Sequence, residues 1–440
     1  MMACELHLSG LINKLKKIIE IIFSRSTRKF NVILGDFMKK QNKSIFVCEL
    51  FYPDTQATSI LFSPLIASLV NEGREIEVLS GFGNASDVHN LSRSEIWENV
   101  PIKRCGARVN GKNGRIFRGI SYVSFLLSVL IKIVFSTRKL NLIGVTNPPF
   151  LAWVLYLGCV LRGHTFTYVF LDLHPEGIIK LGMLKKSGII SRLWIWLNGI
   201  AYRKAKNIGV LGRDMIPILE ENYQIDESKI FYFPHWSAVE VEAPKAFKDS
   251  DFVRKLGLSD KFVVQYSGNM GLWHDMNAFV QAAKSLEGYP DICFLFIGGG
   301  LKKDEALKLS QGMNVSNIVW HDFVPIAELT DSLSASHVSL ISLKEGLSGV
   351  AVPCKLYGIL SSGRCVLAQV PSNSEVAMTV LENNCGFVVD PGDSQGLAAK
   401  VLELRNDREK TLKFGGNSFL SYKEKYRISN AKDTFIKHVF

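Results

Sequence analysis

The chain has 440 residues and a mass of 49.2 kDa, more than one hydrophobic core usually supports, so two domains are expected. Its 47% hydrophobic and 21% charged residues exclude low-complexity disorder, collagen-like repeats and a small disulfide module. The 52 Lys and Arg against 41 Asp and Glu leave a net charge of +11, which favours anionic partners: nucleic acid, phosphorylated small molecules or an anionic membrane face.

Residues 1–37 form a basic amphipathic extension whose apolar run lies between Leu11 and Phe23. Charged residues interrupt this run and no small-residue cleavage site follows, so a secretory signal peptide is not expected. Two interpretations stay open. The segment is either a helix that lies on anionic lipid through its Lys side chains, or an upstream extension, because Met38 stands directly before a strong predicted strand.

Two further apolar stretches, residues 120–135 and 148–161, are shorter than the roughly 18 to 20 uninterrupted apolar residues that span a bilayer. We expect buried helices of an α/β domain there rather than transmembrane segments. Basic residues beside these stretches leave an interfacial position open. They are Arg115, Arg118, Lys132, Arg138 and Lys139.

Short apolar strands alternate with longer helical stretches in residues 38–232, which is typical of a parallel sheet with helical crossovers. This part is predicted to be a Rossmann-like domain with its ligand at the carboxyl ends of the strands. Strands are predicted at 44–50, 75–80, 140–145, 165–171 and 207–211, and helices at 59–72, 120–135, 150–162 and 191–204.

Periodicity is lost at residues 233–250, which are predicted to be an interdomain linker with His235 and Trp236 packed at the domain junction. The pattern restarts in residues 251–440, so the expected fold class is α/β, with two doubly wound domains that face a cleft. Strands are predicted at 262–266, 292–297, 318–321, 338–342, 365–369 and 386–389, and helices at 278–285, 302–311, 326–334, 355–362 and from 395 onward.

The eight Cys are scattered at long intervals without a C-x-x-C pair, and several stand in apolar runs. Reduced Cys behaves there as a small hydrophobe, which favours a reducing, cytoplasmic compartment. No metal site and no cofactor are expected.

The segment from Tyr266 to Asp275 ends a predicted strand and opens a helix. Its small residues Gly268 and Gly271 let backbone amides approach a phosphate, and the following helix N-terminus favours anionic charge. An ordinary strand-to-helix turn would show the same pattern, so this loop alone does not identify a phosphate-binding site.

Three further signals follow in order: Gly298–Gly300 after a strand, His321–Pro325 after the next, and Pro353-Cys354-Lys355 at a helix start. Together with the glycine loop they resemble the nucleotide-sugar half of the family 4 glycosyltransferases of GT-B fold, particularly the bacterial capsule, O-antigen and colanic-acid-type enzymes. Segments 51–58, 146–149 and 172–176 resemble the first half of that subgroup, and the resemblance spans about residues 43–427.

The resemblance implies three groups of site residues. The donor would lie on the glycine loop, the base beside residues 322–325, and the phosphates and ribose at the Pro-x-Lys helix start. Asp172, His174 and Glu176 would act on the sugar or the acceptor, with helix capping by Glu176 as the alternative. The donor-binding set is Gly268, Asn269, Gly271, Trp273, His274, Phe323, Val324, Lys355, Tyr357 and Gly358, with Arg364 as a further cation; the acceptor-side loop contributes Thr55, Gln56 and Thr58.

The sequence departs from the family pattern at several positions. Val350 and Gly358 stand where many members carry two Glu, the second of which holds the donor ribose. A basic residue usual after the glycine loop is missing near Trp273. Many family members carry a His at the position directly before the Asp, where this chain has Leu171. His174 is therefore expected to take the role of that His.

The expected function is a retaining glycosyltransferase that moves a sugar from a nucleotide diphosphate sugar to a polyprenyl-linked glycan in surface polysaccharide biosynthesis. Retention is implied by the resemblance alone. The enzyme is expected to be peripheral at the cytoplasmic, anionic face of the cell membrane, with no nucleic-acid partner. Alternatives are a nucleotide-sugar epimerase of the same fold and a non-catalytic membrane-associated scaffold.

Overall fold

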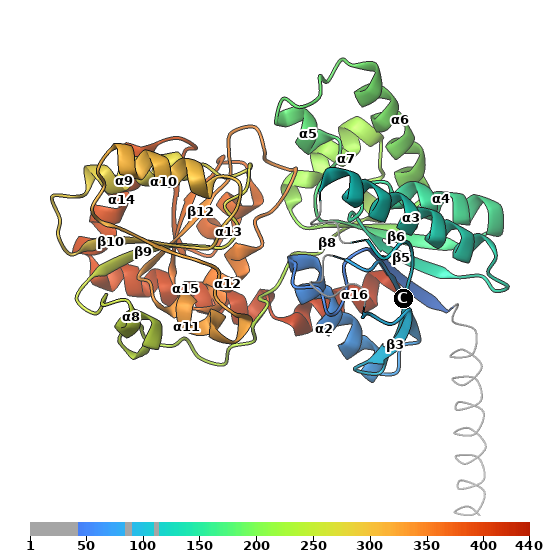
Figure 1. Cartoon of the computed structure of the whole chain (residues 1–440), viewed down its shortest axis with the longest axis horizontal. Helices are drawn as coiled ribbons and strands as arrows, with labels where there is room; N and C mark the ends of the chain where they lie inside the picture. Colours follow the sequence, from blue (N-terminus) through green and yellow to red (C-terminus); the bar gives the residue numbers. More distant parts are fainter. Residues whose placement is uncertain (1–42, 84–89, 110–113) are drawn as a thin grey trace, which may run out of the picture. The chain divides into compact units, whose positions relative to one another are not determined.

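The computed structural model describes residues 43–83, 90–109 and 114–440 (Figure 1). The chain divides into two compact units, residues 1–43 and 44–440, and the second is described here. The predicted amphipathic extension of residues 1–37 lies outside the described residues. Residues 44–440 contain two sheets, so the prediction of two doubly wound α/β halves is confirmed.

The first sheet has eight strands in the order β3-β4-β2-β1-β5-β6-β7-β8, and every neighbouring pair is parallel except the antiparallel pair β3 and β4. Near-continuous apolar runs form the central strands because helices cover both faces. The strands are β1 Ser44–Cys48, β2 Ile76–Ser80, β3 Ser94–Trp97, β4 Val100–Arg104, β5 Asn141–Val145, β6 Thr165–Phe170, β7 Asn207–Val210 and β8 Ile230–Tyr232.

Two groups of helices cover this sheet. One cluster of buried side chains includes Phe62 and Phe435, while the other includes Phe125 and Leu155. Packing joins α3 to α4, α4 to α6, and α6 to α7, whereas α2 packs against α16. The helices are α2 Ala57–Asn71, α3 Arg115–Val134, α4 Leu151–Arg162, α5 Glu176–Lys180, α6 Ile189–Lys204 and α7 Ile216–Tyr223.

The second sheet has six strands, all parallel, in the order β11-β10-β9-β12-β13-β14. Its strands are β9 Phe262–Ser267, β10 Ile292–Ile297, β11 Ile318–His321, β12 Val338–Ser342, β13 Cys365–Gln369 and β14 Gly386–Val389. Its helices are α8 Asp251–Lys255, α9 Met276–Ser285, α10 Lys303–Gly312, α11 Leu329–Ser334, α12 Lys355–Ser361, α13 Glu375–Glu382, α14 Ser394–Asn406 and α15 Arg408–Lys425.

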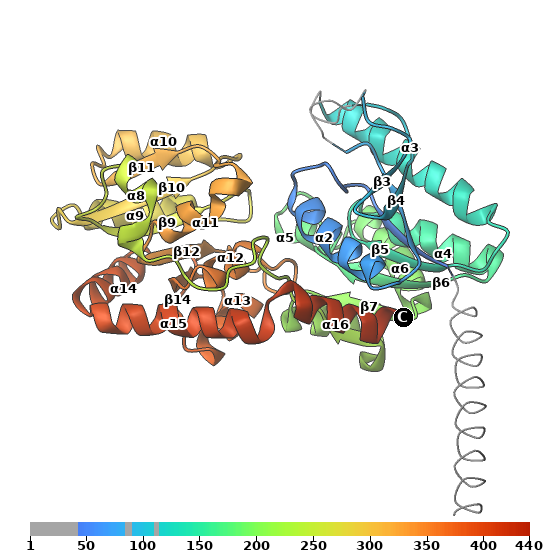
Figure 2. The same cartoon turned by 90° about the horizontal axis from the view of Figure 1, so that it is seen from below.

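The last helix, α16 Ile428–Val439, returns to the first sheet. Figure 2 shows α16 following α15 and lying beside α2. Phe435 is fully buried in the cluster of α2, where its ring meets Phe233. The chain therefore joins the two halves twice, and residues 428–440 pack with the first half although the sequence grouped them with residues 251–440.

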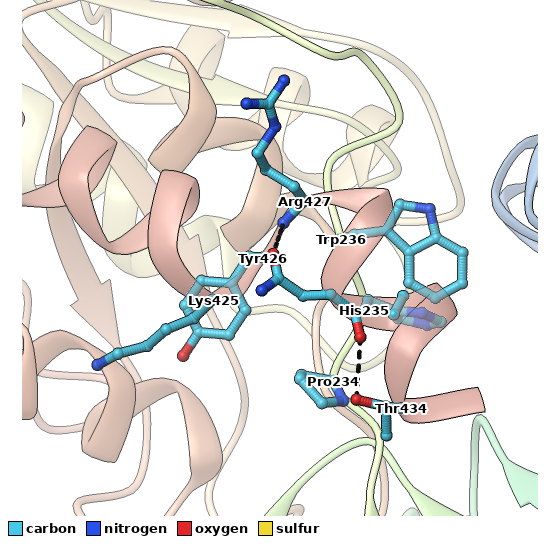
Figure 3. Close-up of a pocket in the computed structure, with 9 residues that line it drawn as sticks. Pro234, His235, Trp236, Lys425, Tyr426, Arg427 and Thr434 are labelled. Atoms are coloured by element: carbon cyan, nitrogen blue, oxygen red, sulfur yellow. Dashed lines mark hydrogen bonds between the residues drawn. The ribbon is translucent and has the colours of Figure 1, made fainter. Parts of the chain in front are cut away.

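The linker packs against the junction of α15 and α16. A small pocket there is lined by Pro234, His235 and Trp236 on one side and by residues around Tyr426 on the other (Figure 3). His235 and Trp236 are 6% and 2% exposed, and Trp236 packs edge-on against Phe62. The predicted packing role of this pair at the junction agrees with these contacts.

Helix α3 begins at Arg115, earlier than predicted, and its stretch Ile116–Val134 is long and apolar enough to cross a membrane by length and composition. The expectation that this region is too short to span a bilayer is therefore wrong. Its side chains Phe125, Val129 and Ile133 are nevertheless buried in the core beside α4. These contacts are the packing expected of a helix that covers a sheet.

Candidate active site

The loop after β9 lies against the Gly298–Gly300 turn after β10. The Gly268 amide donates to the Ile297 carbonyl at 2.9 Å and the Met270 amide to the Gly299 carbonyl at 2.7 Å. A Cβ on Gly298, which has a φ of +126°, would lie 2.2 Å from the Gly268 oxygen. Only glycine allows this approach, so the two glycine-rich turns form one surface.

An open hollow of about 500 Å³ lies on this surface. The structure brings three predicted donor residues together there, namely Asn269, Gly271 and Trp273. The other side of the hollow begins at Gly300 of the predicted Gly298–Gly300 signal, and sequence reasoning missed Leu301 and Asp304 beside it. The remaining lining residues are Leu272, Gly300, Leu301 and Asp304.

Lys355, the first residue of α12, reaches this loop. Its Nζ donates to the Tyr266 hydroxyl, lies 3.4 Å from the Asn269 carbonyl and sits 3.8 Å above the centre of the Tyr266 ring. Burial lowers the pKa of Lys355 to about 7. A half-buried lysine in contact with the loop is placed to meet an anionic group bound there.

His274 and Phe323 flank the same loops. The His274 Nδ1 donates to the Ser342 carbonyl at 2.6 Å, and burial followed by the charge of Lys355 lowers its pKa to about 3. His274 is therefore neutral at pH 7. The Phe323 ring is 61% exposed and lies within 3.3 Å of where a Cβ on Gly298 would stand. Val324, next to it, packs against the cluster of Phe252.

Asp172 and His174 follow β6 at the carboxyl edge of the first sheet and are half-buried. Asp172 forms an isolated antiparallel bridge with Ala351, and the Leu173 amide donates to the Val350 carbonyl at 2.8 Å. Burial raises the pKa of Asp172 to about 6 and lowers the pKa of His174, whose Nδ1 is buried without a hydrogen-bond partner in the described structure.

The segment after β6 also touches the donor loop. A Cβ on Gly177 would lie 3.3 Å from the Trp273 ring, and Lys180 Nζ donates to the Ser348 carbonyl at 2.9 Å. Trp273 thus connects the donor hollow to the segment that carries Asp172. The predicted catalytic segment and donor loop, nearly a hundred residues apart in sequence, adjoin in the structure.

Three predicted site residues have structural contacts instead. Glu176 is buried, and its Oε1 accepts from the Tyr223 hydroxyl at 2.6 Å, so it braces α5 against α7; no side-chain cap starts α5. Tyr357 is fully buried, with its ring 5.1 Å from that of Tyr426. Arg364 donates to the carbonyls of residues 245 and 334, which ties the linker to α11 rather than to the donor loop.

Other predicted positions remain accessible. Thr55 and Gln56 are exposed and Thr58 is half-exposed, at the turn into α2. Gly358 lies in the first turns of α12, where an added Cβ would meet only Leu333 Cδ1, at 3.4 Å.

Sequence reasoning missed Glu49, which follows β1 at the same sheet edge. Its Oε1 accepts from the Ser121 hydroxyl at 3.3 Å, and burial raises its pKa to about 7. A carboxylate directly after a buried strand was the signal that could have found it.

Within the residues that the structure describes, no three His, Cys, Asp or Glu side chains gather as a metal site. The described Cys residues are all free thiols.

Comparisons with known proteins agree with this geometry. Residues 261–407 match the family model of glycosyl transferases group 1, which covers the second sheet and the Lys355 helix. A protein named as glycosyltransferase WbjE, from Pseudomonas aeruginosa, is 26% identical over 67% of this chain and 74% of its own length. The chain is a glycosyltransferase. Its residues 261–407 are similar to the group 1 glycosyl transferases, and its relatives include a named enzyme of polysaccharide biosynthesis.

Two further relatives are similar over most of the chain. A colanic acid biosynthesis glycosyl transferase named WcaI, from Escherichia coli, is 26% identical over 69% of this chain and 75% of its own length. The structure of Anabaena HepE in complex with UDP has a TM-score of 0.66 and 13% identity, covering 90% of this chain and 98% of that one. The glycosyltransferase thus has the GT-B fold, and neither the epimerase nor the scaffold is favoured.

Proposed function

We propose that this glycosyltransferase moves a sugar from a nucleoside diphosphate sugar to a lipid-linked glycan acceptor, with retention of the anomeric configuration. The observation that carries the proposal is the contact of the Asp172 segment with Trp273 of the loop after β9 and with Val350 before α12. It places groups suited to a diphosphate beside groups suited to sugar hydroxyls.

The diphosphate would lie on the loop amides of residues 269–271, with Lys355 as its cation. Departure of the diphosphate develops negative charge on its oxygen, and preorganised amides and an ammonium stabilise that charge. The exposed Phe323 ring offers a face on which the base can stack. Complexes of Anabaena HepE with UDP and UDP-glucose support a nucleotide-sugar donor in a protein of this fold.

Asp172 and His174 would orient hydroxyl groups of the transferred sugar and the acceptor. In the transfer, the bond between the anomeric carbon and the diphosphate oxygen breaks, and the acceptor oxygen bonds to the same carbon on the same face. The acceptor proton leaves on the diphosphate. Because loop amides and Lys355 supply the positive charge, we propose that transfer needs no divalent metal and that the enzyme has no cofactor.

The test is an assay with purified full-length protein, a panel of UDP- and GDP-sugars and a polyprenyl-linked glycan extract. We expect release of one nucleotide diphosphate that depends on the acceptor, with a glycan enlarged by one sugar of unchanged anomeric configuration. Asp172→Asn should reduce product formation about 100-fold or more, and Asp260→Asn, an exposed carboxylate just before β9 and outside the hollow, is the matched control. Release of no nucleotide from any donor, or an epimerised sugar without transfer, would contradict the proposal.

A further inference from the structure

Helix α3 carries apolar side chains on its solvent face as well as on its buried face. A solvent-covered helix normally has polar residues there. The outward side chains of α3 are between 44% and 78% exposed. They are Ile116, Phe117, Ile120, Val123, Leu127 and Ile131.

Helices α4 and α6 continue this apolar surface. Helix α4 packs between α3 and α6, and the three lie side by side in both views (Figures 1 and 2). Leu157, Val160 and Leu161 of α4 and Ile189, Ile190, Leu193 and Trp196 of α6 are exposed. Of the 25 large apolar side chains exposed in the described residues, 15 lie between positions 116 and 196. Such concentration on one face marks an interaction surface, which we call the α3–α4–α6 face.

The positive charge of the protein concentrates in the same region. Residues 101–204 contain sixteen Lys and Arg against two carboxylates, Asp172 and Glu176, an excess larger than the +11 of the whole chain. Helices α3, α4 and α6 contain no Asp or Glu. Exposed basic residues border the apolar side chains: Arg118, Lys132, Arg138, Lys139, Arg162, Lys185, Lys186 and Arg192.

We propose that the α3–α4–α6 face lies in the interfacial layer of an anionic lipid bilayer, with its apolar side chains at the acyl boundary and its basic residues on lipid phosphates. Apolar and cationic side chains without carboxylates match that surface. In a two-fold contact between copies the same basic residues would face one another, which disfavours a second copy as the occupant. Helix α3 lies along the surface rather than across the bilayer, because Phe125 and Val129 hold it in the core.

This placement turns the carboxyl edge of the first sheet, which carries Asp172, toward the bilayer surface. That matters for catalysis only if the acceptor is lipid-linked, as proposed above. The face reaches the carboxyl edge of the first sheet at two points. Ser121 of α3 bonds to Glu49 after β1, and the Phe150 ring after β5 lies 4.8 Å from that of Trp194 in α6. Asp172 follows the neighbouring strand β6, so an acceptor held at the bilayer surface would meet the site from this edge.

The experiment is flotation of the full chain with vesicles of phosphatidylcholine alone or with phosphatidylglycerol added, at low and high salt. We expect binding to the anionic vesicles that weakens with salt. Leu127→Asn with Ile131→Asn should weaken binding about tenfold or more, and so should Lys132→Glu with Arg138→Glu. Leu412→Asn with Leu420→Asn on α15, at similar exposure, is the matched control and should bind like the wild type. Thermal melting and donor affinity of each variant verify its fold.

Three outcomes would overturn the inference. The first is a wild-type protein that stays with the soluble fraction. The second is unchanged binding of both double variants, Leu127→Asn with Ile131→Asn and Lys132→Glu with Arg138→Glu, which would assign attachment to another segment such as residues 1–43. The third is a dimer in light scattering that the Leu127→Asn, Ile131→Asn variant loses, without vesicle binding. Transfer to the polyprenyl-linked glycan extract is measured in parallel. Absent transfer with intact vesicle binding then counts against the proposed function alone.

Discussion

Replacing Lys355 by Met removes the ammonium that contacts the donor loop while keeping most of the side-chain volume. Lys355 Nζ contacts the Tyr266 hydroxyl, the Asn269 carbonyl and the Tyr266 ring, and within the described residues no carboxylate forms a salt bridge with it. A bound diphosphate would supply the missing negative charge. We therefore expect Lys355→Met to lower donor affinity by the value of a charge-assisted hydrogen bond, about 1.5 to 3 kcal/mol, or roughly 10- to 150-fold.

The lowered pKa of Lys355 adds a pH dependence with a definite sign. With a pKa of about 7 in the free protein, Lys355 is mostly protonated at pH 6 and mostly neutral at pH 8. A bound diphosphate favours the charged form, so binding above pH 7 must take up a proton. Affinity should thus be full below pH 7 and fall about tenfold between pH 6 and pH 8, and the gap between wild type and Lys355→Met should narrow over the same range.

Isothermal titration calorimetry with UDP-glucose and GDP-mannose measures both quantities, because buffers of different ionisation enthalpy report the proton taken up. Lys308→Met, an exposed lysine on α10, is the matched control and should keep the wild-type affinity and pH dependence. An affinity for the bound donor that is equal at pH 6 and pH 8, or equal in Lys355→Met and wild type, would refute the assignment of Lys355 to the diphosphate.

Three further changes test other parts of the site. Asp172→Asn should reduce turnover about 100-fold or more and leave donor affinity unchanged. In the wild type, ionisation of Asp172 should make the rate rise through pH 6, and the variant should lose this rise. If the rise persists in the variant, another group causes it. Gly358→Ala should raise the free energy of unfolding by about 0.5 to 1 kcal/mol, since its Cβ has room in α12, and a lower urea midpoint would contradict this. Treatment with EDTA should leave transfer unchanged, and a rate restored only by added Mg²⁺ or Mn²⁺ would show that a metal is required.

The central strands and helices could be predicted because each is a near-continuous apolar or amphipathic run in a parallel sheet. The edge pair β3 and β4 could not: its strands alternate exposed and buried residues over only four or five positions, a signal too short to separate from a loop. The packing of α16 against the first sheet could not be predicted from the sequence either. Its amphipathic pattern shows that one face is buried, but not which of two sheets buries it.

The sequence could predict those parts of the site whose role depends on one short segment of the chain. Glycine loops and a lysine at a helix start locate the phosphate side, since backbone approach and charge are properties of the segments themselves. Glu176 and Tyr357 stand beside the predicted site segments in sequence, yet a helix turns neighbouring side chains in different directions, and theirs point into the protein. Their structural roles depend on tertiary contacts, which cannot be read from the sequence.

Trp273 shows how the two halves depend on each other. Where the family resemblance leads one to expect a basic residue, this chain places an aromatic ring that lines the hollow after β9 and packs on Gly177 of α5. This position therefore supplies no positive charge to the phosphates, and more of the charge that stabilises a bound diphosphate must come from Lys355. In exchange, the ring links the donor hollow to the segment that carries Asp172.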